Sequence, residues 1–206
     1  MTPRARRRDG YHHGDLAAEV RRHALALVAR RGRPDFTLRE LATAAGVAHS
    51  AVYAHYANKE ALVAALAVEG LDTLNQRQAQ AIAPLPDDAL IRLHAMGLAY
   101  VEFGRRQPGH YRLVFMRDAG EHEDAAVGEA RRRAAGLMLE VIRAGQAAGR
   151  VRAGDAERIA ALLWATAHGL AMLAITGQVR DLPGAAADFE RTVDEALRAV
   201  LDALRA

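Results

Sequence analysis

The stretch that decides the fold runs from residue 37 to residue 62 and has the sequence TLRELATAAGVAHSAVYAHYANKEAL. Thr37 and Glu40 have the spacing of a capping box, in which the hydroxyl and the carboxylate each satisfy a free backbone amide at the start of a helix. Apolar residues then recur at helical spacing as far as Gly46, which readily takes the left-handed conformation that ends helices. Val47 is expected to fill the turn against a neighbouring helix. These residues predict a helix, a tight turn and a second helix.

The second helix is expected from about Ala48 to Tyr56. Small residues alternate there with hydrogen-bonding ones, so that a backbone lying close to a groove can still project several polar groups. The projecting side chains are His49, Ser50, Tyr53 and His55. Asn58 is predicted to cap a third helix that begins at Lys59, the only lysine of the chain. Because a cation is unfavourable at the positive end of a helix, a DNA phosphate docked at the same end is the expected compensation.

The combination of Gly-Val at 46–47, Tyr-x-His-Tyr at 53–56 and Asn-Lys-Glu-Ala-Leu at 58–62 resembles the DNA-binding domain of the TetR-like family of bacterial transcriptional regulators. The resemblance extends back through Tyr-His-His-Gly-Asp-Leu at 11–16. It implies that Thr37 and Arg39 contact the DNA backbone and that His55, Tyr56 and Lys59 contact DNA phosphates. It also implies that His49, Ser50 and Tyr53 contact bases in the groove. Packing at the rim of the core is the alternative role for the two tyrosines.

One position departs from the family pattern. Ala48 stands where many relatives have a serine or threonine that caps the recognition helix. The missing cap is expected to cost the first turn about 1 kcal/mol. Since His49 and Ser50 can each pair with more than one base edge, the operator sequence cannot be derived from the chain.

The composition is that of a globular protein with a substantial core, since 51% of the 206 residues are hydrophobic. The chain contains no cysteine, which excludes disulfides and thiolate metal sites. Positive charge gathers near the helix-turn-helix: residues 1–60 contain 11 Lys and Arg against 6 Asp and Glu, and the remainder contains 17 against 19. Four arginines, Arg4, Arg6, Arg7 and Arg8, form a basic arm that either follows DNA or remains a disordered tail.

Nearly every segment has a helical period and none alternates like a strand, so we predict an all-α fold of about nine helices. The expected organisation is a basic arm at 1–10, a three-helix helix-turn-helix domain at 11–60, a linking helix at 61–84 and a larger helical bundle at 85–206. Within the bundle, helices are expected at about 87–106, 108–117, 123–148, 155–178 and 185–205.

The location of the protein is expected to be cytoplasmic. The basic N-terminal stretch lacks the apolar segment of a signal peptide. Residues 159–179 carry no formal charge and approach the length of a membrane span. Thr166, His168 and Gln178 interrupt this stretch, which favours a helix buried in an interface over one that crosses a membrane.

Trp164, His168 and Gly169 form the most informative cluster of the second half. Residues i and i+4 share a helix face, so the indole and the imidazole are expected one turn apart. This Trp-x3-His-Gly pattern, following Pro-x2-Tyr-Arg-Leu-Val-Phe at 108–115, resembles the C-terminal domain of a TetR-like subfamily named for those three residues. The resemblance implies a domain that senses an unidentified ligand and dimerises.

A ligand pocket is predicted inside this second domain, with a lining of aromatic and methionine side chains. The expected lining residues are Tyr100, Phe103, Tyr111, Phe115, Met116, Met138, Trp164, His168 and Met172. Packing in the bundle, or at a dimer seam, is the alternative for Trp164 and His168. A small-molecule effector that binds one of two conformations more tightly would lower the affinity for operator DNA.

The last helix carries apolar residues at steps of three and four, which predicts a stripe that faces a partner. The stripe consists of Phe189, Val193, Leu197, Val200, Leu201 and Leu204. Together with the uncharged helix before it, the stripe could build a four-helix interface in a homodimer. Two-fold symmetry would place two recognition helices about 34 Å apart, at successive turns of the major groove.

Enzymatic activity and a cofactor are not expected. His12 and His13 with Asp15, and His122 among acidic neighbours, have neither the helical His-x3-His spacing nor the third ligand of a specific metal site. The sequence also lacks a Gly-rich phosphate loop and a Gly-x-Ser-x-Gly turn. The leading interpretation is a ligand-responsive DNA-binding repressor. A constitutive DNA-binding regulator is the alternative, and a metal-dependent enzyme is a remote one.

Overall fold

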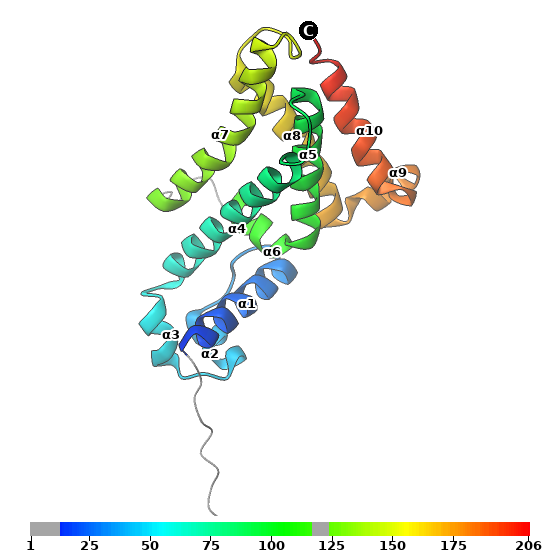
Figure 1. The fold of residues 1–206 in the computed structure, drawn as a ribbon. Coiled ribbons are helices and arrows are strands. Elements are labelled where there is room, and N and C mark those ends of the chain that lie inside the picture. The colour runs from blue at the N-terminus through cyan, green and yellow to red at the C-terminus, as the bar shows by residue number, and fades with distance from the viewer. Residues whose placement is uncertain (1–12, 117–123) are drawn as a thin grey trace, which may run out of the picture.

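The computed structural model describes residues 13–116 and 124–206, and these residues form helices joined by short turns (Figure 1). The elements are α1 (His13–Arg31), α2 (Leu38–Ala45), α3 (His49–His55), α4 (Lys59–Ile82), α5 (Ala89–Arg106), α6 (Pro108–Phe115), α7 (Ala125–Ala147), α8 (Ala156–Thr176), the 3-10 helix η1 (Gln178–Asp181), α9 (Pro183–Ala187) and α10 (Phe189–Asp202). The described part contains no strand, only an isolated bridge between Val151 and Arg205. The prediction of an all-α chain is confirmed, whereas the basic arm and His122 with Glu121 and Glu123 lie outside the described residues.

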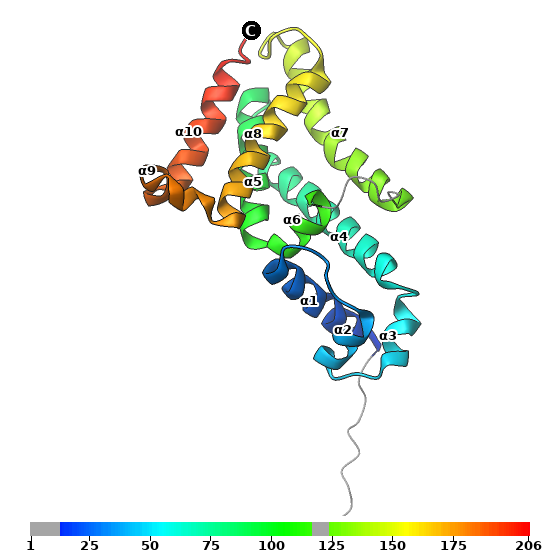
Figure 2. The same ribbon diagram turned by 180° about the vertical axis from the view of Figure 1, so that it is seen from behind.

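The three helices α1, α2 and α3 group at one end of the molecule, and α4 runs from them to the larger bundle at the other end (Figures 1 and 2). Figure 2 shows α6 between the two groups, next to α1. Leu113 of α6 is fully buried in the same apolar cluster as Leu41 of α2 and Val52 of α3. The core of the helix-turn-helix therefore includes a residue from the second half of the chain.

Close packing between α6 and α1 depends on Gly109. A Cβ atom added at Gly109 would lie 2.5 Å from the backbone carbonyl oxygen of Leu25 in α1. No real side chain is tolerated at that distance from a backbone atom, so only glycine lets the two helices approach this closely.

The segment before the last helix differs from the expectation. Pro183 does not simply break the chain but occupies the first turn of the short helix α9, a position that proline favours. Asp188 then caps α10, because its carboxylate accepts a hydrogen bond from the amide of Arg191 at 3.1 Å. The last helix consequently begins at Phe189 rather than at residue 185.

Among the described helices, α8 is the one that is long and apolar enough to cross a membrane. One side of α8 packs into the bundle through residues such as Ile159, Leu163 and Ala171. Only 28% of its most apolar window is buried within the chain, so an uncharged face of α8 remains accessible.

Candidate nucleic-acid interface and candidate ligand cavity

The helix-turn-helix begins with the predicted capping box. The amide of Thr37 donates to the Glu40 carboxylate at 2.7 Å, and the amide of Glu40 donates to the Thr37 hydroxyl oxygen at 3.1 Å. Gly46 ends α2 in the left-handed conformation, with φ 67° and ψ 32°. The amide of Val47 donates to the carbonyl of Ala42 at 3.0 Å, and the Val47 side chain packs against the buried cluster. These contacts fix the angle at which α3 leaves the turn.

One side of α3 is anchored in the core and the other is open. Val52 is fully buried, whereas His49, Ser50 and Tyr53 are exposed, Tyr53 to 48%. His49 and Tyr53 are four residues apart and thus share a face. Ala48 makes no side-chain hydrogen bond at the start of α3, as its sequence predicts. A short helix with polar groups on its free face has the geometry that enters a major groove.

The other expected DNA contacts lie around this face. Thr37, Arg39 and His55 are exposed. Tyr56 is half-buried beside the core, and its hydroxyl accepts from Arg21 Nη1 at 3.4 Å. The position of Tyr56 is therefore compatible with packing at the rim of the core, the alternative to a phosphate contact.

Lys59 has a partner that the sequence did not suggest. Its Nζ donates to the backbone carbonyl oxygen of Pro34 at 3.4 Å, next to the loop between α1 and α2. This contact offsets part of the unfavourable placement of a cation at the start of α4. An ammonium group has three donors, so two remain for other acceptors.

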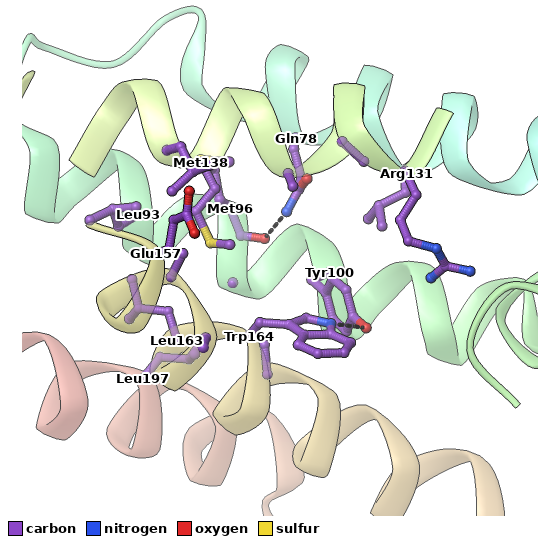
Figure 3. Close-up of a pocket in the computed structure, with 18 of the residues that line it drawn as sticks. Gln78, Leu93, Met96, Tyr100, Arg131, Met138, Glu157, Leu163, Trp164 and Leu197 are labelled. Carbon is purple, nitrogen blue, oxygen red and sulfur yellow. Dashed lines mark hydrogen bonds between the residues drawn. The ribbon is translucent and has the colours of Figure 1, made fainter. Parts of the chain in front are cut away.

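The larger bundle encloses a cavity of about 410 Å³ that is bordered by α4, α5, α6, α7, α8 and α10 (Figure 3). Its wall is mostly apolar, with Leu74, Met96, Met138 and Leu163 among the lining residues. Ala135 on α7 and Ala161 and Trp164 on α8 line the cavity and are also exposed. The cavity thus opens between α7 and α8. Its size is within the range typical of small-molecule sites.

The predicted lining is only partly the lining that the structure has. Tyr100, Phe115, Met138 and Trp164 border the cavity. The other predicted residues, Phe103, Tyr111, Met116, His168 and Met172, are not part of its wall: the first two are fully buried in the core, Met116 is exposed to 38%, and the last two are half-buried. On α7 the sequence predicted Met138 but not Arg131, Ala134 and Ala135, which precede it at helical spacing. Alanines and an arginine at helical spacing resemble any solvent-facing helix, so the sequence pattern does not mark them as a cavity wall.

A polar network borders one end of the cavity. Trp164 Nε1 donates to the Tyr100 hydroxyl oxygen at 3.0 Å. His168 Nδ1 lies 2.7 Å from the Tyr111 hydroxyl and 3.1 Å from that of Tyr100. Burial lowers the pKa of His168, raises the pKa of Tyr100 to about 12 and raises that of Tyr111. At neutral pH the imidazole is therefore uncharged and both hydroxyls keep their protons.

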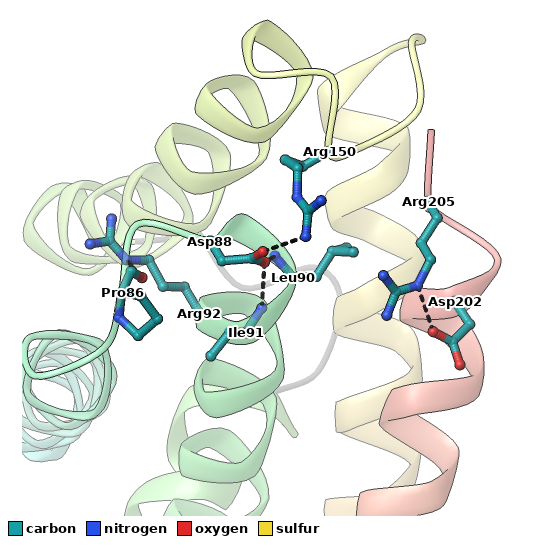
Figure 4. A network of polar contacts seen from close by, with 8 residues as sticks. All are labelled: Pro86, Asp88, Leu90, Ile91, Arg92, Arg150, Asp202 and Arg205. Atoms are coloured by element: carbon teal, nitrogen blue, oxygen red, sulfur yellow. Dashed lines mark hydrogen bonds and ion pairs between the residues drawn. The ribbon is translucent and has the colours of Figure 1, made fainter.

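The far end of the bundle is held by ion pairs and caps (Figure 4). Asp88 accepts from the amide of Leu90 at 2.9 Å at the start of α5, and Arg150 Nη2 donates to the same carboxylate at 2.6 Å. This guanidinium keeps the pKa of Asp88 below its usual value. The amide of Arg152 donates to the carbonyl of Leu204 at 2.8 Å. The turn between α7 and α8 is thereby tied to both α5 and the C-terminal end.

The apolar stripe of α10 faces the chain's own core instead of a partner. Val193 and Leu197 pack with α5 and α8, and Leu201 and Leu204 pack with the neighbouring cluster. Only Phe189 and Val200 of the predicted interface are half-buried. The assignment of the four buried residues to a dimer interface is therefore wrong, because a stripe has the same pattern whether it packs within a chain or between chains.

Within the described residues, no group of three or more His, Asp or Glu side chains is placed so that it could hold a metal ion. His12, Glu121, His122 and Glu123 lie outside those residues, whereas Asp124 caps the start of α7. The fold and the exposed face of α3 define a DNA-binding protein of the helix-turn-helix class.

Comparison with known families places the chain within this class. Residues 21–66 match the family described as bacterial regulatory proteins, tetR family, and residues 93–200 match the tetracyclin repressor-like C-terminal domain. The chain belongs to the TetR family of transcriptional regulators. No curated protein matches it.

Solved structures agree with this assignment. A protein of unknown function from Rhodococcus sp. RHA1 is 30% identical, with a TM-score of 0.79 over 96% of this chain and 100% of that one. A bacterial regulatory protein of the tetR family from Rhodococcus RHA1 is 25% identical, with a TM-score of 0.69 over 90% and 96%. A TetR family transcription regulator from Marinobacter aquaeolei VT8 shares the fold at 16% identity, with a TM-score of 0.73 over 92% and 95%.

Proposed function

We propose that this protein is a cytoplasmic, homodimeric repressor that leaves its operator when a small molecule enters the cavity of the larger bundle. The observation that carries the proposal is the exposed polar face of α3. The capped helix α2 and the tight turn at Gly46 position α3, and the buried Val52 anchors it in the core. Groove contacts from His49, Ser50 and Tyr53, with backbone contacts from Thr37, Arg39, His55, Tyr56 and Lys59, follow from family resemblance.

The accessible faces of α8 and α10 support a homodimer. On α8, Leu162 is 44% exposed, and Ala165 and Gly169 are exposed on the same side. On α10, Ala199 is exposed beside the half-buried Val200, and Ala203, which caps the end of the helix, is exposed as well. The residues named on both faces are uncharged and mostly small, which permits close helix packing. Two copies of this pair of helices would form a four-helix interface around a two-fold axis.

The position of α6 supports control by a ligand. Tyr111 on α6 contacts His168, one turn from the Trp164 that lines the cavity. Leu113, two residues further along α6, is buried in the core of the helix-turn-helix. A molecule that displaces Trp164 would therefore act on a helix shared by both regions, which is the differential interaction that a conformational switch requires.

The proposal is tested by selecting bound sequences from random double-stranded DNA with the purified full-length protein. We expect a palindromic site, bound about 10³-fold or more over bulk competitor. Tyr53→Ala should weaken binding to that site by about 1–3 kcal/mol without altering the thermal transition, because Tyr53 is half-exposed. An absence of any sequence preference at low ionic strength would show that the proposal is wrong.

Release of the selected DNA by small molecules tests the proposed control by a ligand. The fluorescence of Trp164, the only tryptophan, reports entry into the cavity. A broad compound panel should contain molecules that change this signal and also release the selected DNA. If no compound does either, the protein is a constitutive regulator.

A further inference from the structure

A glutamine interrupts the apolar face of α4 that lines the cavity. Leu71, Leu74 and Gln78 follow one another at steps of three and four, and all three border the cavity. Gln78 is only 7% exposed. Glutamine is seldom buried in proteins, because its amide loses hydrogen bonds to water, and a leucine would fill the same space without that loss. A buried glutamine on this face therefore indicates a position where a hydrogen bond is used.

The Gln78 amide has one hydrogen-bond partner within the part of the chain that the structure describes. Its Nε2 donates to the backbone carbonyl oxygen of Met96 in α5 at 3.3 Å. Because a carbonyl oxygen can only accept, this contact sets the orientation of the amide, with the nitrogen toward Met96 and Oε1 turned away from it (Figure 3). No group of the described residues donates to Oε1, and the second N–H of Nε2 is also left over. The amide thus keeps one acceptor and one donor for a molecule in the cavity.

The hydroxyl of Tyr100 and the indole of Trp164 are the other uncharged polar groups of the described wall. Both already have partners within the chain. Trp164 Nε1 donates to the Tyr100 hydroxyl oxygen at 3.0 Å, and the same hydroxyl lies 3.1 Å from His168 Nδ1. Gln78 is therefore the uncharged polar side chain of this wall that has most left to offer a ligand.

The charged side chains of the described wall lie to either side of this amide. Figure 3 shows Glu157 and Arg131 on opposite sides of Gln78. Glu157 is exposed, and Arg131 Nη2 donates to the backbone carbonyl of Val114 at 3.1 Å. An ionised ligand group at Gln78 would lose its hydration without meeting an opposite charge on the amide. The position of Gln78 therefore favours an uncharged polar group.

From the open side of this amide we infer that the effector is an uncharged, mostly apolar alcohol whose hydroxyl group binds Gln78. The inference rests on the proposed function, since it names the class of molecule that the same cavity takes. The hydroxyl proton is donated to Oε1, and the hydroxyl oxygen keeps lone pairs that can accept from Nε2. A ketone can only accept, so it would leave Oε1 buried without a donor. At about 30 Å³ for each water-sized group, the cavity of about 410 Å³ holds about 14 such groups, which suits an alcohol of about 11–14 non-hydrogen atoms.

The first experiment compares molecules that share a carbon skeleton and differ in the polar group. Undecan-2-ol, undecan-2-one and undecan-2-amine form a linear series, and adamantan-2-ol with its ketone and amine forms a compact one. Binding to the wild-type full-length protein is measured by the fluorescence of Trp164, below the solubility limit of each compound. We expect at least one alcohol to bind about tenfold or more tightly than its ketone and its amine. If no alcohol exceeds its ketone, or if an amine binds most tightly, the inference is wrong.

Variants locate the hydroxyl group. Gln78→Leu should weaken binding of the preferred alcohol by about tenfold and leave binding of the ketone unchanged or tighter, because the unpaired amide oxygen is gone. A cavity that is merely distorted would lose affinity for both. Gln76→Leu is the matched control, because Gln76 lies two residues earlier on α4, is exposed and does not line the cavity. Equal losses for alcohol and ketone in Gln78→Leu would overturn the inference.

A separate measurement distinguishes this inference from the proposed function. Binding of the selected DNA is measured without any compound for the wild type and for Gln78→Leu, and we expect the two to agree. The preferred alcohol should release this DNA from the wild type, and about tenfold more of it should be needed for Gln78→Leu. A protein that binds its operator, but shows no preference for alcohols, removes the inference alone. A protein that prefers alcohols, but neither binds nor releases a specific DNA site, removes the proposed function.

Discussion

Arg112 in α6 donates a hydrogen bond from Nη1 to the backbone carbonyl oxygen of Ala29 in α1, at 3.2 Å. Nη2 of the same guanidinium donates to the carbonyl of Ile175 near the end of α8, at 3.5 Å. Both carbonyls lie in the last turn of their helices, where no further amide of the helix can satisfy them. One cation thus interacts with the negative ends of two helices, one in the helix-turn-helix and one beside the cavity.

We expect Arg112→Met to lower the free energy of unfolding by about 1–3 kcal/mol, because two helix-terminal carbonyls lose a charged donor. Urea denaturation followed by far-UV circular dichroism measures the change. Arg106→Met is the control, since Arg106 is largely exposed and its ion pair within the described residues is with the neighbouring Glu102, a contact worth about 0–1 kcal/mol. Equal effects of the two substitutions would contradict the bridging role of Arg112.

The start of α3 offers a gain of stability. Ala48 has extended backbone angles, φ −66° and ψ 140°, which suit a capping residue, but it provides no side-chain acceptor. Ala48→Ser should therefore stabilise the protein by about 0.5–1 kcal/mol, since the serine oxygen can accept from an amide of the first turn. Thermal unfolding of the variant beside Ala44→Ser, an exposed substitution inside α2, measures the difference. A lower transition for Ala48→Ser than for the wild type would refute the prediction.

Most of the helix-turn-helix followed from the sequence because its signals are local. The capping box of Thr37 and Glu40, the left-handed Gly46 and the uncapped Ala48 each involve residues within one turn of the chain. Such interactions depend on backbone geometry that the residue types themselves fix. The TetR family assignment could be reached for the same reason, since the motif at residues 53–62 is short and specific.

The cavity and the outer surface could be predicted only in part. Arg131 and Leu74 come together with Trp164 only through the packing of three helices, which no local pattern determines. The stripe of α10 was assigned to a partner although Leu197 and Leu201 pack within the chain. Amphipathic periodicity shows that a face is buried, but the sequence does not show what covers it.

Lys59 tests whether α4 approaches phosphate. Lys59→Ala should weaken operator binding and reduce the slope of log K against log salt by about one unit. The thermal transition should change little, since the lost contact with the Pro34 carbonyl is a single hydrogen bond at 3.4 Å. Fluorescence anisotropy over a series of salt concentrations provides the measurement. A slope equal to that of the wild type would mean that the ammonium contacts only the protein.

Stability should decrease as the solution becomes mildly acidic. Burial lowers the pKa of both His110 and His168, and for His110 the neighbouring Glu69 acts in the opposite direction. As the pH falls below about 6.5, the unfolded chain binds protons before the folded one does, so the free energy of unfolding falls. Each histidine contributes at most about 1.4 kcal/mol per pH unit. Urea titrations at pH 7.5 and 5.5 should show this loss, and it should be smaller in His168→Gln. Equal stability of the wild type at both pH values would contradict the prediction.

The proposed dimer can be tested at Gly169 without disturbing the single chain. A Cβ added at Gly169 has no atom within 4 Å, so a long side chain there meets only solvent in the protomer. In a two-fold interface formed by α8, residue 169 of one protomer lies close to residue 169 of its partner. Gly169→Arg would therefore place two buried positive charges close together. We expect sedimentation to show a dimer for the wild type at micromolar concentration and a monomer for Gly169→Arg, with weaker operator binding. Gly136→Arg on α7, where an added Cβ also has no neighbour within 4 Å, should remain dimeric. A dimeric Gly169→Arg protein would move the interface away from α8, and a monomeric wild type would exclude it altogether.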